Sequence, residues 1–351
     1  MSKLFRSPKA LTILIFALAA FILSVAGGAL GNEFGGGFLG SPIAHIQLPA
    51  EPVLEDELFP GFELTNTMVT TWITVLVIIV LAFFATRRMT EVPTGIQNVF
   101  EALIEFFSDL ATSIAGPERG RRFLPLALTI FLFIVTANWL GILPGFGTIG
   151  RIETPEDVIH HAEVADGHEV DLAEVHLQIF DGDGSFGLLL PGSVDDEITA
   201  AEFEEHGVDH GKQAGLLVPF LRSANTEVNT TLAIAIVAMV MVHFWGFRTL
   251  GILGHAGKFL NFKSGPIALF VGLLEIISEV ARLISFTFRL FGNIFAGEVL
   301  LIAIAFLLPL IGIIPFLGLE LFVGLIQAFI FSILTLVFAA LATTGHDTEH
   351  H

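Results

Sequence analysis

Long apolar runs constrain this chain more than any other feature of its sequence. They cover Met68 to Ala85, Phe123 to Leu143, Val228 to Phe247, Ile267 to about Leu310, and Glu320 to Leu341. Each is close to or longer than the roughly 20 residues that cross the hydrocarbon core of a bilayer as a helix. Backbone groups inside a bilayer must bond within their own segment, which favours helices. The sequence therefore predicts an all-α polytopic membrane protein with about five transmembrane helices.

Composition and charge agree with this class. Hydrophobic residues make up 54% of the 351 residues and charged residues 15%, against about 25% charged in soluble domains. The absence of cysteine excludes disulfides and thiolate metal sites. The formal net charge of −19 comes largely from one acidic segment between Thr148 and Gly215, in which Arg151 and Lys212 are the basic residues.

The N-terminus has the pattern of a targeting segment. Lys3, Arg6 and Lys9 precede an apolar run, and Ser24 and Ala26 are small residues at the spacing that signal peptidase requires. Residues 1–28 are therefore either a cleaved signal peptide or an uncleaved anchor helix. In both cases the glycine-rich and acidic residues 29–67 form an extracytoplasmic segment.

The distribution of Lys and Arg predicts the orientation of the helices. Basic residues flank the spans on one side, at Arg87 and Arg88, at Arg119 to Arg122, and at Arg248 to Lys263, and this side is cytoplasmic by the positive-inside rule. Arg222 is an exception on the outer side. The chain then divides into residues 68–147 with two transmembrane helices, an acidic extracytoplasmic insert at 148–226, and C-terminal transmembrane helices at 227–351 with a cytoplasmic C-terminus.

Two local patterns add detail to this division. From Ile96 to Ile114 apolar residues recur with a helical period, which predicts an amphipathic helix lying in the membrane interface or against a partner subunit. Thr94 and Gln97 are spaced as a capping box for its start. In the insert, the alternation from Val170 to Phe180 and the DGDG that follows predict a β-hairpin.

A polar stripe marks the long apolar segment after Ile267. Its members are spaced by three or four residues and share one face of a helix: Glu275, Ser278, Arg282, Ser285, Arg289 and Asn293. Ionisable residues inside a membrane are functional candidates. Arg289 stays charged and needs a partner. It is either a functional residue or part of a structural ion pair with Glu275 or Glu320. Snorkelling to the interface suits Arg282 better.

Two further polar positions lie near this stripe in sequence. Glu298 follows Arg289 by nine residues and points to roughly the opposite face of the helix. In the last span, Glu320 and Gln327 are seven residues apart and share a face.

At these residues the sequence resembles ATP synthase subunit a. The segment FRLFGNIFAGEVL from Phe288 to Leu300 is similar to the most specific motif of that family, and GLIQAFIFSILTLVF from Gly324 to Phe338 resembles its last helix. ANWLGILPG, NTEVNTTLA and PTGIQN resemble weaker family motifs in the same order. The position of Glu320 is histidine in some members of the family.

The resemblance implies a fold and a function. Two long tilted C-terminal helices form a hairpin against a ring of c subunits, and the peripheral-stalk b subunit is the other partner. Arg289 faces the carboxylates of the ring. Asn293, Glu298, Glu320 and Gln327 line an outer proton half-channel, and Glu275, Ser278 and Ser285 line an inner one. No cofactor, nucleotide or nucleic acid is implied for this chain, which lies in a bacterial-type cell membrane.

Other functions fit the residues less well. A self-contained transporter usually shows an internal repeat with broken helices, which is not found here, and a scaffold gains nothing from a buried polar stripe. GILGHAGKF at Gly251 to Phe259 fails as a P-loop, because Ile252 stands at the first glycine position. His243 is interpreted as an interface histidine rather than a relay. The insert's histidines suggest a metal site, but a solvated acidic loop that attracts cations is the simpler interpretation.

Overall fold

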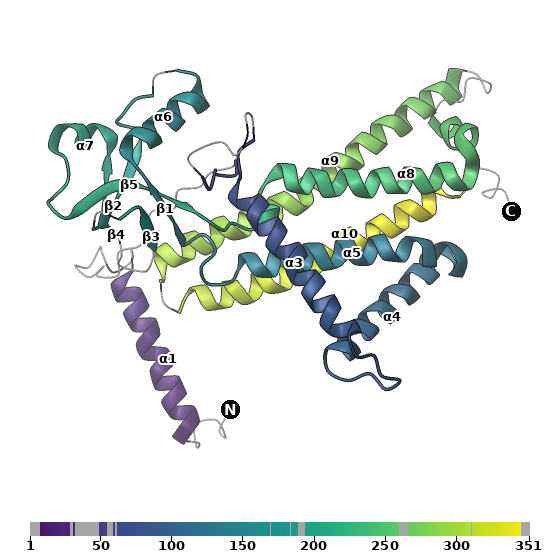
Figure 1. The fold of residues 1–351 in the computed structure, drawn as a ribbon, viewed down its shortest axis with the longest axis horizontal. Coiled ribbons are helices and arrows are strands. Elements are labelled where there is room, and N and C mark those ends of the chain that lie inside the picture. Colours follow the sequence, from purple (N-terminus) through teal and green to yellow (C-terminus); the bar gives the residue numbers. More distant parts are fainter. Residues whose placement is uncertain are drawn as a thin grey trace. The chain divides into compact units, whose positions relative to one another are not determined.

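The computed structural model describes residues 8–28, 31, 49–54, 59, 62–168, 170–182, 184–188, 194–259, 266–309 and 311–344. The long helices are α1 Pro8–Gly27, α3 Asn66–Thr86, α4 Ile96–Ala115, α5 Pro117–Gly141, α8 Val228–Phe259, α9 Pro266–Leu307 and α10 Ile313–Ala342 (Figure 1). Six of the described helices, all of these except α4, are long and apolar enough to cross a membrane. The prediction of a polytopic helical membrane protein is confirmed.

Helix ends differ from the predicted spans where proline and glycine intervene. α5 begins at Pro117, ahead of the predicted start at Phe123, because proline is favourable at the first helical position. The predicted capping box of α4 is wrong. Gly95 is its N-cap and makes no side-chain cap bond. The Gln97 amide instead donates to the Thr90 carbonyl oxygen at 3.0 Å and to the Glu101 carboxylate at 2.6 Å.

Contacts divide the chain into two compact units. The first unit comprises Met1–Val69, Gly141–Arg222 and Ala296–Leu321, and the second comprises Thr70–Leu140, Ser223–Phe295 and Phe322–His351. The second unit contains α4, α5, α8 and most of α9 and α10. The predicted domain boundaries at residues 148 and 227 remain predictions, since contacts group segments that are distant in sequence.

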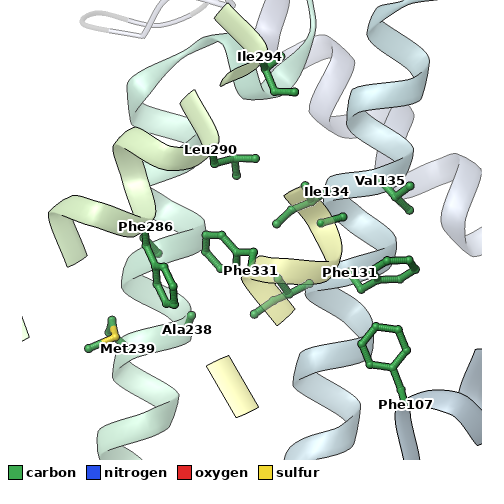
Figure 2. Packing of buried hydrophobic residues seen from close by; sticks show 13 residues of the cluster. Phe107, Phe131, Ile134, Val135, Ala238, Met239, Phe286, Leu290, Ile294 and Phe331 are labelled. Atoms are coloured by element: carbon green, nitrogen blue, oxygen red, sulfur yellow. The ribbon is translucent and has the colours of Figure 1, made fainter. Parts of the chain in front are cut away.

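Aromatic and small side chains make the core of the second unit. Phe107 of α4, Phe131 of α5, Phe286 of α9 and Phe331 of α10 lie within one buried cluster (Figure 2). Ala127, Ala238 and Ala328 are fully buried and let the helix backbones approach. Close packing of this kind holds helices together in lipid, because no hydrophobic effect drives helices together there.

Within the second unit α9 and α10 run antiparallel. The Phe286 and Phe331 rings stack at 4.5 Å between centroids, Gln327 bonds to Arg289, and the Arg282 guanidinium lies 4.9 Å from the centre of the Phe338 ring. Residue numbers thus rise on one helix as they fall on the other. This is the pairing expected of a C-terminal hairpin.

The C-terminal half of α4 packs on the chain's own helices. Phe107, Ala111 and Ala115 are buried, and the Phe106 and Phe329 rings lie 5.7 Å apart. At the start of the helix Ile96 and Val99 stay exposed. The amphipathic pattern is therefore satisfied in part by α5 and α10 within this unit.

The insert in the first unit is an α/β structure. Its strands are β1 Ile149–Glu153, β2 His176–Asp181, β3 Phe186–Leu188, β4 Val194–Thr199 and β5 Lys212–Pro219, in the order β3-β1-β5-β2-β4. The paired strands are antiparallel. Two short helices, α6 Pro155–Asp166 and α7 Ala200–His206, lie beside the sheet (Figure 1).

The predicted β-hairpin is wrong, although its first strand exists. β2 and β3 follow each other in the sequence, but β1 and β5 stand between them in the sheet. β5 lies at the centre of the sheet, and its five consecutive residues from Ala214 to Val218 are buried. Among the described residues, no three His, Asp or Glu side chains come together as a metal site.

Candidate functional site

Arg289 lies on an open face of α9 in the second unit. Its residue is exposed, whereas the next residue, Leu290, is fully buried in the core. Its backbone carbonyl accepts a hydrogen bond of 2.8 Å from the Gln327 amide. Among the described residues of this unit, no carboxylate lies within ion-pair distance of its guanidinium. The predicted alternative of an ion pair with Glu275 is therefore not what the structure has.

Asn293 and Gln327 continue the polar surface from Arg289. Asn293 lies one turn further along α9, and its side-chain Nδ2 is buried without a hydrogen-bond partner among the described residues. Gln327 is 7% exposed. A buried amide without a partner costs about 1–3 kcal/mol, so the Asn293 amide is poised to donate to a group outside this chain or to water.

The beginning of the stripe is an ion-pair cluster rather than a set of isolated residues. Glu275 lies 3.7 Å from the Nη2 atom of Arg282. The Nη1 atom of the same arginine donates to Glu279. Ser278 is partly buried and Ser285 is exposed on the same helix. Arg282 is therefore paired and stacked on Phe338, and its snorkelling to the interface stays a prediction.

Glu298 belongs to the first unit and is paired there with Arg222. The Arg222 Nε and Nη2 atoms donate to the two carboxylate oxygens at 3.1 Å and 3.0 Å, a bidentate geometry. The Arg222 side chain is 6% exposed and that of Glu298 is 26% exposed. A third donation from Arg222 reaches the Pro49 carbonyl oxygen at 3.3 Å. The arginine that was an exception to the charge bias thus has a defined partner.

A buried acid, Glu51, lies near this pair in the first unit. Its carboxylate accepts a hydrogen bond of 2.9 Å from the Asn66 amide, which also donates to the Pro219 carbonyl oxygen at 3.1 Å. Burial raises the pKa of Glu51 to about 7, against the opposing effects of Arg222 and of the Asn66 hydrogen bond. The carboxyl group therefore gains or loses its proton near neutral pH.

Glu320 occupies a place that only a glycine leaves open. A Cβ atom at Gly297 would collide with the Glu320 carboxylate. Gly297 directly precedes Glu298 on α9, so two acids of the predicted outer path, Glu298 and Glu320, meet the same stretch of helix within the first unit.

Three of the residues described in the two units were missed as site candidates in the sequence analysis. Glu279 stands three residues before Arg282, a spacing at which helical side chains meet, so the pattern contained a signal for it. Arg222 carried a signal too, because a lone arginine on the outer side needs a carboxylate. Glu51 had none, since it lies in an acidic segment that looked solvated.

The fold and these sites define an integral membrane protein. Its apolar helices carry ionisable residues, some of which are ion-paired within the chain. A model of the ATP synthase A chain family matches residues 68–340. The ATP synthase subunit a of Gloeobacter violaceus is 29% identical over 81% of this chain and 86% of its own length. That of Mycobacterium bovis is 31% identical over 82% and 90%. That of Moorella thermoacetica is 26% identical over 80% and 92%.

The chain belongs to the ATP synthase subunit a family. It is accordingly a subunit of the membrane sector of an ATP synthase, a complex of ATP synthesis and proton transport. The family resemblance seen in the sequence is confirmed.

Proposed function

We propose that this chain is the stator subunit that passes protons to and from a rotating ring of c subunits through two half-channels. Outer-side groups Asn293, Glu298, Glu320 and Gln327 deliver protons to a ring carboxylate. Inner-side groups Glu275, Ser278 and Ser285 accept them after rotation. The peripheral-stalk b subunit holds the chain against the turning ring.

The observation that carries this proposal is the unpaired, exposed guanidinium of Arg289. Arginine remains protonated in a protein, and an unpaired charge inside a bilayer is expensive. Two other arginines are paired within their own units: Arg282 contacts the Glu279 carboxylate, and Arg222 lies 3.0 Å from the Glu298 carboxylate. Arg289 has none within the described part of its own unit. A carboxylate supplied by a partner subunit satisfies it.

Elementary electrostatics explains what such an arginine does. A fixed positive charge in a medium of low dielectric constant favours the ionised form of a carboxylate that passes it. The ring carboxylate therefore releases its proton on approach and takes another after it has passed. The same charge repels a proton that would cross directly from one half-channel to the other.

The orientation follows from the basic residues. Arg87, Arg119 and Arg248 lie at the ends of spans that the positive-inside rule assigns to the cytoplasm. The C-terminus then lies in the cytoplasm and the acidic insert outside a bacterial-type cell membrane.

Arg289→Ala in the assembled ATP synthase tests the function. We expect ATP-driven proton pumping in vesicles to fall to background, while passive proton leak persists or rises, because the barrier between half-channels is gone. Arg248→Ala is the matched control, since it removes an exposed arginine from α8 outside the stripe. Pumping that survives Arg289→Ala at the level of the control would refute the proposal.

A further inference from the structure

A pair of histidines lies together at the far end of α8. His243 Nδ1 and His255 Nε2 are 3.1 Å apart, at hydrogen-bond distance. Twelve residues of straight helix would separate them by about 18 Å. They meet because Gly251 has the left-handed dihedral φ of 76° and breaks the helix, so that the chain turns back there (Figure 1).

The second histidine is enclosed by the fold. His255 is 1% exposed, and its ring centroid lies 4.6 Å from that of Phe247 and 5.5 Å from that of Phe259. A Cβ atom at Gly246 would collide with the imidazole ring. The position of His255 is therefore fixed by a glycine on one side and aromatic rings on the others.

The first histidine connects this pair to the ion-pair cluster of α9. Its other ring nitrogen, Nε2, is 3.6 Å from Glu279 Oε2. That carboxylate oxygen is buried and has no hydrogen-bond partner among the described residues. Glu279 and Glu275 carry two negative charges against the one positive charge of Arg282. The cluster thus accommodates one more proton without leaving a net charge.

The exposures give the two histidines different roles. The side chain of His243 is 29% exposed and that of Glu279 is 17% exposed, whereas His255 is buried. His243 is the member that can exchange a proton with water, and the hydrogen bond at its Nδ1 decides which way its Nε2 points. The nitrogen that carries the proton on a histidine is set by the bond that the other nitrogen makes.

We propose that His243 is a proton-relay residue on the inner half-channel, which accepts a proton from Glu279 at Nε2 and releases it to water, and that His255 is a positioning residue. This inference rests on the proposed function. In the step, the Glu279 carboxyl loses its proton and becomes a carboxylate, the His243 imidazole becomes an imidazolium, and the imidazolium then gives the proton to water or buffer.

The alternative is that the histidines only fasten the turn at Gly251. A fastening role needs the hydrogen bond between the rings but no contact with Glu279, and it leaves the transport rate independent of added buffer. A relay predicts that a small diffusible base replaces the missing imidazole.

His243→Ala in the assembled enzyme, with imidazole added on the cytoplasmic side, separates the two roles. We expect proton flux through the membrane sector to fall on the order of tenfold. The loss is smaller than for a typical general acid or base, because water can replace part of the function of the imidazole. We expect imidazole to restore most of it. Among the described residues, His243 has polar contacts with Glu279 of α9 and His255 of α8, and Glu279 is in turn paired with Arg282.

Gly246→Ala tests the positioning residue without touching either histidine. Its Cβ displaces the His255 ring, so flux should fall although His243 remains. Gly257→Ala is the matched control on the same turned segment, because an added Cβ there meets nothing within 4 Å. The amount of subunit in purified enzyme checks assembly for every variant.

The outcomes separate this inference from the proposed function. Unchanged flux in assembled His243→Ala, or a loss that imidazole does not restore, overturns the relay while Arg289→Ala still abolishes pumping. Should Arg289→Ala leave pumping intact, the proposed function fails, and the relay fails with it.

Discussion

Glu51→Gln gives a direct test of the buried acid in the first unit. Glu51 is 8% exposed, and burial raises its pKa from 4.5 to about 7. A raised pKa means that the folded segment binds the proton more tightly than the open segment does. The protonated acid therefore stabilises the fold below pH 4.5, and that stability is lost as the pH rises through about 7.

The size of the effect follows from this shift. One pKa unit corresponds to 1.36 kcal/mol, so the segment around Glu51 should lose about 2.5 kcal/mol of opening free energy between pH 5 and pH 8. Above pH 8 both states are ionised and the loss levels off. Glutamine has the shape of the protonated acid and cannot ionise, so the variant should lose almost nothing across the same range.

Hydrogen exchange in the intact complex measures this opening free energy. Exchange of peptides covering residues 49–54 and 64–70 at several pH values, corrected for the intrinsic rate, reports local opening. Glu63→Gln is the matched control, because Glu63 is an exposed acid in the same segment. A pH dependence that is equal in wild type and Glu51→Gln would refute the assignment, as would its absence in wild type.

Two further predictions concern the outer path. Arg222→Leu leaves Glu298 without its cation and should lower the stability of the first unit by about 3 kcal/mol. This is the lower end for a broken buried pair, because Glu298 is partly exposed. Adding Glu298→Gln should recover most of this stability, as measured by hydrogen exchange of the α9 peptide. Equal stability of single and double variants would contradict this. Gly297→Ala should displace the Glu320 carboxylate and lower proton flux at a packing cost of about 1–3 kcal/mol, whereas Gly318→Ala, which meets nothing within 4 Å, should behave as wild type.

Much of the helical fold could be predicted from the sequence because lipid leaves few choices. A backbone in hydrocarbon must bond within its own helix, so the length of an apolar run fixes both the element and its approximate ends. The predicted span from Met68 became Asn66–Thr86, and the predicted run from Ile267 to about Leu310 became Pro266–Leu307. The insert had no such constraint. Its strand order depends on which strand is buried on both faces. The burial of β5 at the centre is seen in the folded structure and was not predicted from the sequence.

The site was predictable along one helix and not across helices. Helical spacing placed Glu275, Arg282 and Arg289 on one face, because 3.6 residues make a turn whatever surrounds it. It could not show that Arg222 meets Glu298 across 76 residues, or that a turn at Gly251 brings His255 to His243. Those contacts depend on how separate segments pack together, and helical spacing within one segment gives no information about that packing.

The three arginines near the spans show why pairing decides function here. Arg222 and Arg282 each meet a carboxylate of their own unit, and a buried pair of this kind contributes little net stability but is costly to break. Such arginines hold neighbouring acids in place. Arg289 is the same residue type on the same helix as Arg282, seven residues further on and therefore on nearly the same face. An acid one turn before Arg289, as Glu279 precedes Arg282, would neutralise it; that turn carries Ser285 and Phe286 instead. Under the proposed function, this unpaired charge serves a carboxylate of a partner subunit that approaches and leaves again.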